Sequence, residues 1–379
     1  MDAQATAPFL RYFSALQDPR RHNVRHMFSD ILTIAILAVL CKSNDWEEVV
    51  CWAKAEAVFL GSILPLPNGI PSVDTFERVF ARINPRSFDA CFNTWAASLA
   101  GSLKDQVVAI DGKSLRHSFE HAWDKQMIHM VSAFATRQQL VLGQLTVDSK
   151  SNEIVAIPKL LTLLDIKGAI VTIDAMGCQR QIAADIREQK ADYILAVKEN
   201  QPVLQEKVSK LLNEAALEKF KDMSHGYFEQ TNGGHGRIET RKVWVTDEVK
   251  WLGKELLALW KDLSSVAMVE STRSVSGGKD SVERHYYISS RKGVDAQAMA
   301  KAIRAHWGVE NNLHWQLDVS FAEDASRLRK DHGAENFSRL RRLTLNLLKN
   351  TPQDKRQSIK TRRYRCSIDR KYLLAVLSQ

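Results

Sequence analysis

The sequence predicts an α/β protein in which a mixed sheet carries helices on both faces. Short apolar runs ending in turn residues recur between residues 107 and 197, and amphipathic helical patterns separate the later ones. The first hundred residues place apolar side chains at helical spacing, whereas residues 224–290 read as strands. A hairpin followed by alternating helices and strands is typical of a mixed sheet.

The expected strands follow in a simple order. The first three are adjacent, and the helical patterns at 153–165 and 179–189 precede the last two. The runs expected as strands are 107–110, 128–136, 140–147, 169–173 and 192–197.

Changes in pattern divide the chain into five segments. A length of 379 residues exceeds one ordinary core and suits several domains. The expected segments are a helical domain at 1–100, the first part of the mixed-sheet core at 103–222, a β-rich insertion at 223–290, C-terminal core helices at 291–350, and a basic segment at 351–379.

Composition favours a reduced, cytoplasmic protein. None of the five cysteines has C-x-x-C spacing, which argues against a disulfide framework and a thiolate zinc site. The longest apolar run, Ile31–Cys41, is well short of the roughly 20 residues that span a bilayer. We therefore expect a buried helix there and no membrane association.

Positive charge is concentrated near the C-terminus. The formal net charge is +9, and the stretch from Ser326 to Lys371 holds 15 Lys and Arg against 4 Asp and Glu. Such a stretch favours a polyanionic partner, although a charge run can also be a solvated face. The candidate phosphate contacts within it are Arg341, Arg342, Arg362 and Arg363.

Three acids are candidates for the chemistry. Asp111 and Asp174 each follow an apolar strand, and ligands bind beyond the carboxyl ends of such strands. Glu310 shares one face of an expected helix with His306 and His314. The structural alternatives are a hairpin turn at Asp111, a helix cap at Asp174 and a polar helix face at Glu310.

Clustered carboxylates without cysteine favour two Mg²⁺ or Mn²⁺ ions. Two such ions promote phosphodiester displacement. A competing zinc site would use His306, Glu310 and His314, but no H-E-x-x-H pattern is present. Asp318 and Asp324 are further acids near Glu310 that leave the assignment of the third ligand open.

Basic residues near the acids are candidate DNA contacts. Lys113 and Arg116 follow Asp111, and Lys198 follows the last core strand. Each position is equally compatible with a solvated edge of the sheet.

Several segments resemble one known family, the H-repeat-associated transposases. These are bacterial insertion-sequence DDE transposases with an RNase H-like core. The resemblance extends from about residue 10 to residue 375, and its clearest motifs are VAIDGKSLR ending at Arg116, IDAMGCQ ending at Gln179 and HWGVENNLHWQLDV ending at Val319.

The resemblance implies a fold, an activity and partners. It implies an RNase H-like core with a helical N-terminal domain for DNA-end binding or assembly, and a β-strand insertion before the last acid. Asp111, Asp174 and Glu310 would be catalytic metal ligands. The enzyme would bind the terminal repeats of its element, cleave DNA and join 3′-hydroxyl ends to target DNA. A homodimer or larger assembly, associated with the nucleoid, is expected.

One departure from the wider superfamily stands out. Its Tyr-x2-Arg-x3-Glu-x6-Lys signature would place Tyr, Arg and Lys where this chain has Ile303, His306 and Leu317. Arg304 or His306 would then substitute in phosphate contact. A retired transposase that only binds DNA, or an RNase H-like nuclease without strand transfer, remain alternatives.

Overall fold

The chain folds into two compact units that are interleaved in sequence. The computed structural model describes residues 8–22, 24–116, 118, 127–147, 153–234, 237–275, 280–352 and 357–379. The first unit comprises Met1–Gly101, Gly112–Asn152 and Glu310–Gln379, and the second comprises Ser102–Asp111 and Glu153–Val309. The chain therefore passes between units directly after Asp111 and directly before Glu310.

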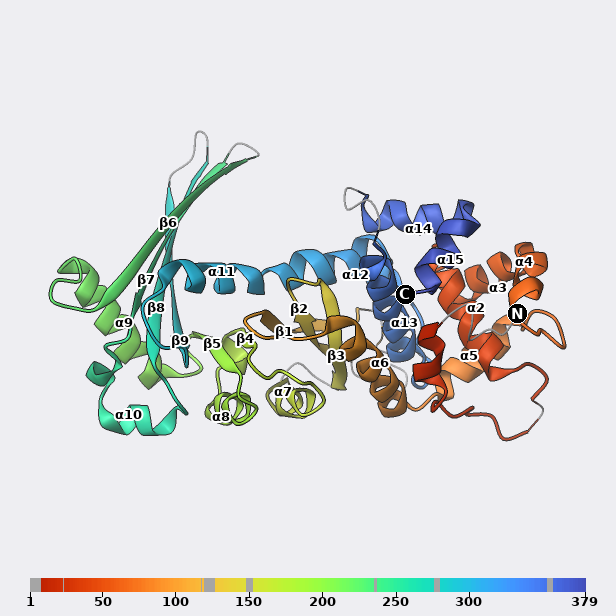
Figure 1. The fold of residues 1–379 in the computed structure, drawn as a ribbon, viewed down its shortest axis with the longest axis horizontal. Coiled ribbons are helices and arrows are strands. Elements are labelled where there is room, and N and C mark those ends of the chain that lie inside the picture. Colours follow the sequence, from red (N-terminus) through yellow and green to blue (C-terminus); the bar gives the residue numbers. More distant parts are fainter. Residues whose placement is uncertain are drawn as a thin grey trace. The chain divides into compact units, whose positions relative to one another are not determined.

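Helices from the N-terminal hundred residues form part of the first unit (Figure 1). Asp45 caps one of them by accepting a hydrogen bond from the amide of Glu48, and Asn84 caps another whose first residue is proline. The elements are η1 (Pro8–Phe13), α2 (Phe28–Leu40), α3 (Trp46–Ala55), α4 (Ala57–Ile63), α5 (Val73–Arg82) and α6 (Pro85–Ala100).

The apolar run expected to form a buried helix does so. Every residue of α2 from Asp30 to Leu40 is buried, because other helices of the unit cover it on all sides. Among the residues that the structure describes, no helix is long and apolar enough to cross a membrane.

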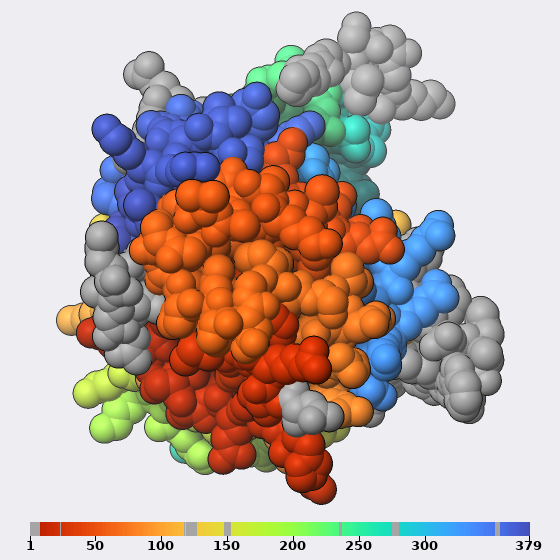
Figure 2. All heavy atoms as spheres, turned by 90° about the vertical axis from the view of Figure 1, so that its right-hand side faces the viewer, coloured from red at the N-terminus to blue at the C-terminus, as the bar shows by residue number. Residues whose placement is uncertain are grey.

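C-terminal helices complete this unit. Helix α13 packs on α2, α5, α6 and β3, and the rings of Trp46 and Phe337 meet edge to face at 4.7 Å. Figure 2 shows the C-terminal residues beside the N-terminal helices on one face of the unit. The elements are η6 (Glu310–His314), α12 (Trp315–Val319), η7 (Glu323–Ala325), α13 (Gly333–Asn350), α14 (Ile359–Ile368) and α15 (Arg370–Leu377).

The first unit also contains an antiparallel hairpin, β2 (His129–Ala135) and β3 (Leu140–Val147), whose first strand is buried throughout. Beside β2 lie the last residues of β1 (Val107–Ser114). Strand β1 continues past Asp111, where the sequence predicted its end, because its last part pairs with the hairpin. Just beyond it, the amide of Leu115 donates to the carbonyl of Ile128 at 2.8 Å.

The second unit holds the parallel part of the sheet. Strands β1, β4 (Ile170–Ile173) and β5 (Asp192–Val197) pair in parallel. Helix α7 (Glu153–Leu161) leads from the hairpin into β4, and α8 (Arg180–Glu188) connects β4 to β5. Parallel neighbours need such crossover helices.

An antiparallel extension follows α9 (Pro202–Leu217) in the second unit. Strand β9 pairs with β5, and β8, β7 and β6 continue outward. The elements are β6 (His225–Gly234), β7 (Arg237–Thr246), η5 (Val249–Leu252), α10 (Lys254–Leu259), β8 (Ser265–Val275) and β9 (Ser281–Ser289).

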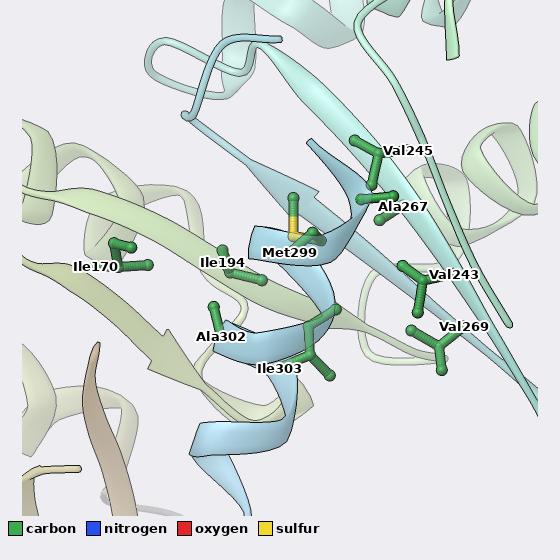
Figure 3. Packing of buried hydrophobic residues seen from close by; sticks show 10 residues of the cluster. Ile170, Ile194, Val243, Val245, Ala267, Val269, Met299, Ala302 and Ile303 are labelled. Atoms are coloured by element: carbon green, nitrogen blue, oxygen red, sulfur yellow. The ribbon is translucent and has the colours of Figure 1, made fainter. Parts of the chain in front are cut away.

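Helix α11 (Ala296–His306) covers the junction between the extension and the parallel strands. Figure 3 shows Met299, Ala302 and Ile303 of α11 facing apolar side chains of both parts of the sheet. Val243 and Ile194 belong to the same buried cluster. This packing fixes α11, and with it the chain that leads to Glu310, to the second unit.

The fold prediction is confirmed. The strands follow the order β3-β2-β1-β4-β5, which is that of an RNase H-like core, and β9-β8-β7-β6 extends it. The helical N-terminal region and the β-rich insertion before the last acid are both present.

Candidate active site

The second unit brings Asp111 and Asp174 to equivalent positions on neighbouring strands. Ile110 of β1 is paired in parallel register with Ile173 of β4, and each acid is the next residue in its chain. Two carboxylates therefore follow the last paired residues of two adjacent parallel strands, the position where ligands bind in such sheets.

Backbone amides orient the Asp174 carboxylate. Its Oδ1 accepts hydrogen bonds from the amides of Met176 at 3.1 Å and Gly177 at 3.3 Å, in the short helix η4 (Ala175–Gly177). The helix-cap alternative for Asp174 is therefore correct as local structure. Both bonds end on Oδ1, so Oδ2 can serve a ligand.

Glycine at position 177 lets this turn pack on β4. A Cβ there would lie 2.2 Å from Cγ2 of Ile173, which no ordinary contact permits. The tight exit from the strand thus depends on the absence of a side chain.

A loop after β5 braces the same turn. The Asn200 side-chain amide donates to the carbonyl of Ala175 at 2.6 Å, and that of Gln201 donates to the carbonyl of Cys178 at 3.0 Å. Lys198, at the start of this loop, is exposed. The sequence placed Lys198 after the last core strand, and the structure confirms that position. The turn itself is held by Asn200 and Gln201.

His306 lies against the strand that carries Asp174. Its Nδ1 is 3.1 Å from Oγ1 of Thr172, two residues before the acid and on the same side of the strand. This hydrogen bond places His306, the last residue of α11, within the second unit. Arg304, two residues earlier, is exposed.

Glu310 begins a π-helical turn in the first unit. The turn, η6, replaces the regular α-helix that the sequence suggested, and such turns occur often at functional sites. Oε2 of Glu310 is 3.5 Å from Nδ1 of His314, whose side chain is only 6% exposed while that of Glu310 is 55% exposed. Leu313 and Leu317 are buried, as expected.

Each unit by itself offers groups that suit a divalent cation. In the second unit, Asp111 and Asp174 carry carboxylate oxygens directly after the paired residues of two adjacent strands. In the first unit, Glu310 carries a carboxylate and His314 a ring nitrogen 3.5 Å from it.

The side chain of Lys113 is buried and pairs with two carboxylates, so it is not exposed for contact with a phosphate. Its side chain is 9% exposed, and Nζ lies 2.7 Å from Oδ1 of Asp318 and 3.1 Å from Oδ1 of Asp324. Arg116 is 72% exposed, and its Nε lies 3.4 Å from the other oxygen of Asp324.

The four C-terminal arginines predicted as phosphate contacts are buried, which corrects the expectation of a basic surface at these positions. Partners distant in sequence enclose them: Arg342 pairs with Glu323 at 3.1 Å, and Arg363 donates to the carbonyl of Val39 at 2.7 Å. The residues concerned are Arg341, Arg342, Arg362 and Arg363, with exposed fractions of 2%, 0%, 7% and 2%.

The sequence placed His314 on the helix face of Glu310, and the structure sets its Nδ1 3.5 Å from Oε2 of Glu310. Sequence reasoning missed one residue near this turn, Lys349. Lys349 donates from Nζ to the carbonyl of Asn312 at 2.8 Å, inside the turn that Glu310 begins. No local pattern around Lys349 indicates that contact.

A sheet of this order, with acids after two adjacent parallel strands, defines the RNase H-like class of folds. A family model described as "Transposase DDE domain" matches residues 102–347, and one described as "DDE_Tnp_1-associated" matches residues 10–96. The chain therefore belongs to the DDE transposase family.

Full-length relatives agree with this assignment. The "H repeat-associated putative transposase YhhI" of Escherichia coli strain K12 is 39% identical over 381 residues, covering 97% of both chains. The "Putative transposase YncI" of Escherichia coli O157:H7 is 38% identical over 372 residues, covering 97% of this chain and 94% of the relative.

Among solved structures, the cryo-EM structure of the piggyBac transposase synaptic complex with hairpin DNA aligns with a TM-score of 0.49 and 11% identity. The alignment covers 99% of this chain and 81% of that chain.

Proposed function

We propose that this transposase cleaves DNA at the ends of its insertion element and joins the freed 3′-hydroxyl groups to target DNA. The observation that carries the proposal is the pairing of Ile110 with Ile173, which sets Asp111 and Asp174 directly after the paired residues of neighbouring strands. Glu310, the third acid, is joined directly to Val309, the last residue of the unit that holds the other two.

Asp111, Asp174 and Glu310 would hold two Mg²⁺ or Mn²⁺ ions. Carboxylate oxygens are the ligands that these cations prefer, and the donor set contains no thiolate that would favour a softer metal. When bound, two such ions activate the attacking hydroxyl and stabilise the charge on the leaving oxygen.

The chain itself would orient these acids. Amides of the η4 turn hold one oxygen of Asp174 and leave the other to face a cation. The buried ring of His314 constrains the exposed carboxylate of Glu310. Such outer contacts fix the orientation of metal ligands before substrate binds.

Exposed cations near these segments would contact DNA phosphates. Arg116 follows Asp111 in the chain, Arg304 precedes Glu310, and both are exposed. Lys198 is exposed at the start of the loop that braces the Asp174 turn. His306, hydrogen-bonded to Thr172, would support the strand rather than bind phosphate. Two element ends must be handled together, so a homodimer or larger assembly is expected, with residues 1–100 available for end binding or assembly.

The test is cleavage of DNA carrying the element's terminal repeats in Mg²⁺ or Mn²⁺. We expect the wild type to cut and Asp111→Asn, Asp174→Asn and Glu310→Gln to bind DNA without cutting. Glu188→Gln, which alters an exposed acid on α8, is the matched control and should cut normally. Cutting by all three variants would refute the assignment of these acids.

A second assay separates the remaining alternatives. Ends that already carry a free 3′-hydroxyl are mixed with plasmid target, and joined products are counted. Cleavage without joining would identify a nuclease. DNA binding with neither reaction would identify a retired transposase.

A further inference from the structure

Lys113 occupies an unusual position in the first unit. It lies on β1 two residues after Asp111, so the two side chains emerge on the same face of the strand. The side chain is almost fully buried, and the acids that pair with it, Asp318 and Asp324, come from a segment far along the sequence.

That segment is the one that carries Glu310. Helix α12, which contains Asp318, follows the π-helical turn η6 without a break, and Asp324 lies in η7 shortly after it. These elements are five, five and three residues long, too short to be stable alone. Their geometry must therefore come from contacts with neighbouring elements.

Lys113 supplies such a contact from the strand side, and α13 supplies another. Glu323, adjacent to Asp324, is buried and pairs with Arg342 of α13 at 3.1 Å. Although burial favours its protonated form, the charges of Arg342, Arg341 and Lys113 hold the pKa of Glu323 below its ordinary value. Lys113 is thus part of a charged network around this segment.

Removing the Lys113 charge would leave two carboxylates facing each other in a partly buried place. Asp318 and Asp324 both lie about 3 Å from the same Nζ, at 2.7 and 3.1 Å. Unneutralised charges of like sign repel strongly where water is partly excluded. The segment would then move away from β1 and take Glu310 with it.

We propose that Lys113 is a positioning residue that fixes the Glu310 segment against the last residues of β1 within the first unit, and that it thereby controls how tightly Glu310 holds a metal ion. This inference rests on the proposed function. It differs from a phosphate contact, because Lys113 acts through Asp318 and Asp324 and does not touch DNA.

The experiment measures Mn²⁺ binding to the full chain by titration calorimetry and by electron paramagnetic resonance, without DNA. Losing a group that orients metal ligands typically costs about 10- to 100-fold in metal affinity. We expect Lys113→Met to weaken Mn²⁺ binding by at least about tenfold, and Lys113→Arg to retain most of it. Lys207→Met, which removes a lysine bonded to the carbonyl of Leu252 in the second unit, is the matched control.

DNA binding is measured on the same variants. A positioning role predicts that Lys113→Met leaves the DNA dissociation constant and its salt dependence unchanged. Unchanged Mn²⁺ affinity together with a salt slope reduced by about one unit would overturn the proposal in favour of a phosphate contact. If Lys113→Met does not fold, Asp318→Asn replaces it, and wild-type Mn²⁺ affinity in that variant overturns the proposal.

Failure of the underlying function gives a different result. If the wild type binds Mn²⁺ no better than Asp111→Asn or Glu310→Gln, the metal assignment itself fails. If the wild type binds Mn²⁺ through these acids while Lys113→Met binds equally well, only the positioning role fails.

Discussion

Lys349 of α13 donates a hydrogen bond to the carbonyl of Asn312 in the turn that Glu310 begins, with Nζ 2.8 Å from the oxygen. The ammonium also lies 3.2 Å from Oε1 of Gln139 and over the ring of Phe134. Burial, with the charge of Arg362 adding to it, lowers the pKa of Lys349 to about 7.

This lowered pKa predicts that stability rises with pH. An unfolded lysine has a pKa of about 10.4, so between about 7 and that value the unfolded chain binds a proton that the folded chain lacks. The free energy of unfolding should therefore increase as pH rises through this window. In Lys349→Met that increase should be much smaller.

Urea unfolding of the wild type and of Lys349→Met at about pH 6.5 and about pH 9.5 measures this pH dependence of stability. Lys210→Met, which removes an exposed lysine on α9, should keep the wild-type pH dependence. Parallel pH profiles for wild type and Lys349→Met would show that Lys349 titrates normally.

Arg339 should be among the residues most important for stability. It donates to both oxygens of Asp89 at 2.7 Å and to Glu335 at 3.1 Å, and it is 1% exposed. Breaking a buried pair leaves an uncompensated charge, so Arg339→Met should lower the free energy of unfolding by about 3–5 kcal/mol.

Urea denaturation measures the loss, and Arg370→Met provides the contrast. Arg370 pairs with Glu56 but is itself 62% exposed, so loss of this pair should cost about 0–1 kcal/mol. Similar losses in the two variants would mean that the network around Arg339 contributes little.

Gly177→Ala should impair the Asp174 turn. The added Cβ would meet Cγ2 of Ile173 at 2.2 Å, and the shift needed to relieve this contact would displace the amides that hold Asp174. We expect DNA cleavage to fall by at least about tenfold with little change in DNA affinity, because small misplacements of reacting groups are costly.

Single-turnover cleavage rates test this expectation. Gly61→Ala, at a helical glycine with open space around it, should cleave normally. Partial recovery of the cleavage rate in the double variant Gly177→Ala with Ile173→Ala would show that the contact with Ile173 causes the defect. Normal cleavage by Gly177→Ala alone would contradict the role of the turn.

Lys198→Ala should change the salt dependence of DNA binding. Its ammonium is exposed beside the loop that braces the Asp174 turn, and loss of one phosphate contact lowers the log–log salt slope by about 0.9 for duplex DNA. Fluorescence anisotropy across a salt series gives the slope. Lys210→Ala is the control, and equal slopes for Lys198→Ala and wild type would exclude the contact.

The sequence by itself determined the strands of the core and the positions of two acids on them or directly after them. An apolar run followed by an acid is a local pattern, which places Asp111 within β1 and Asp174 directly after β4. The helical N-terminal region and the β-rich insertion are equally visible in the sequence, since hydrophobic periodicity reports which face of an element is buried.

Only the tertiary structure decided which charged side chains are buried in pairs and which are exposed. The C-terminal arginines resemble a DNA-binding surface in the sequence, but Arg339 and Arg342 meet Asp89 and Glu323 inside the first unit. The engagement of Lys113 with Asp318 and the π-helical turn at Glu310 likewise have no local signal. Periodicity reports burial along one element, whereas a charge is paired or free according to which distant residues the fold brings to it.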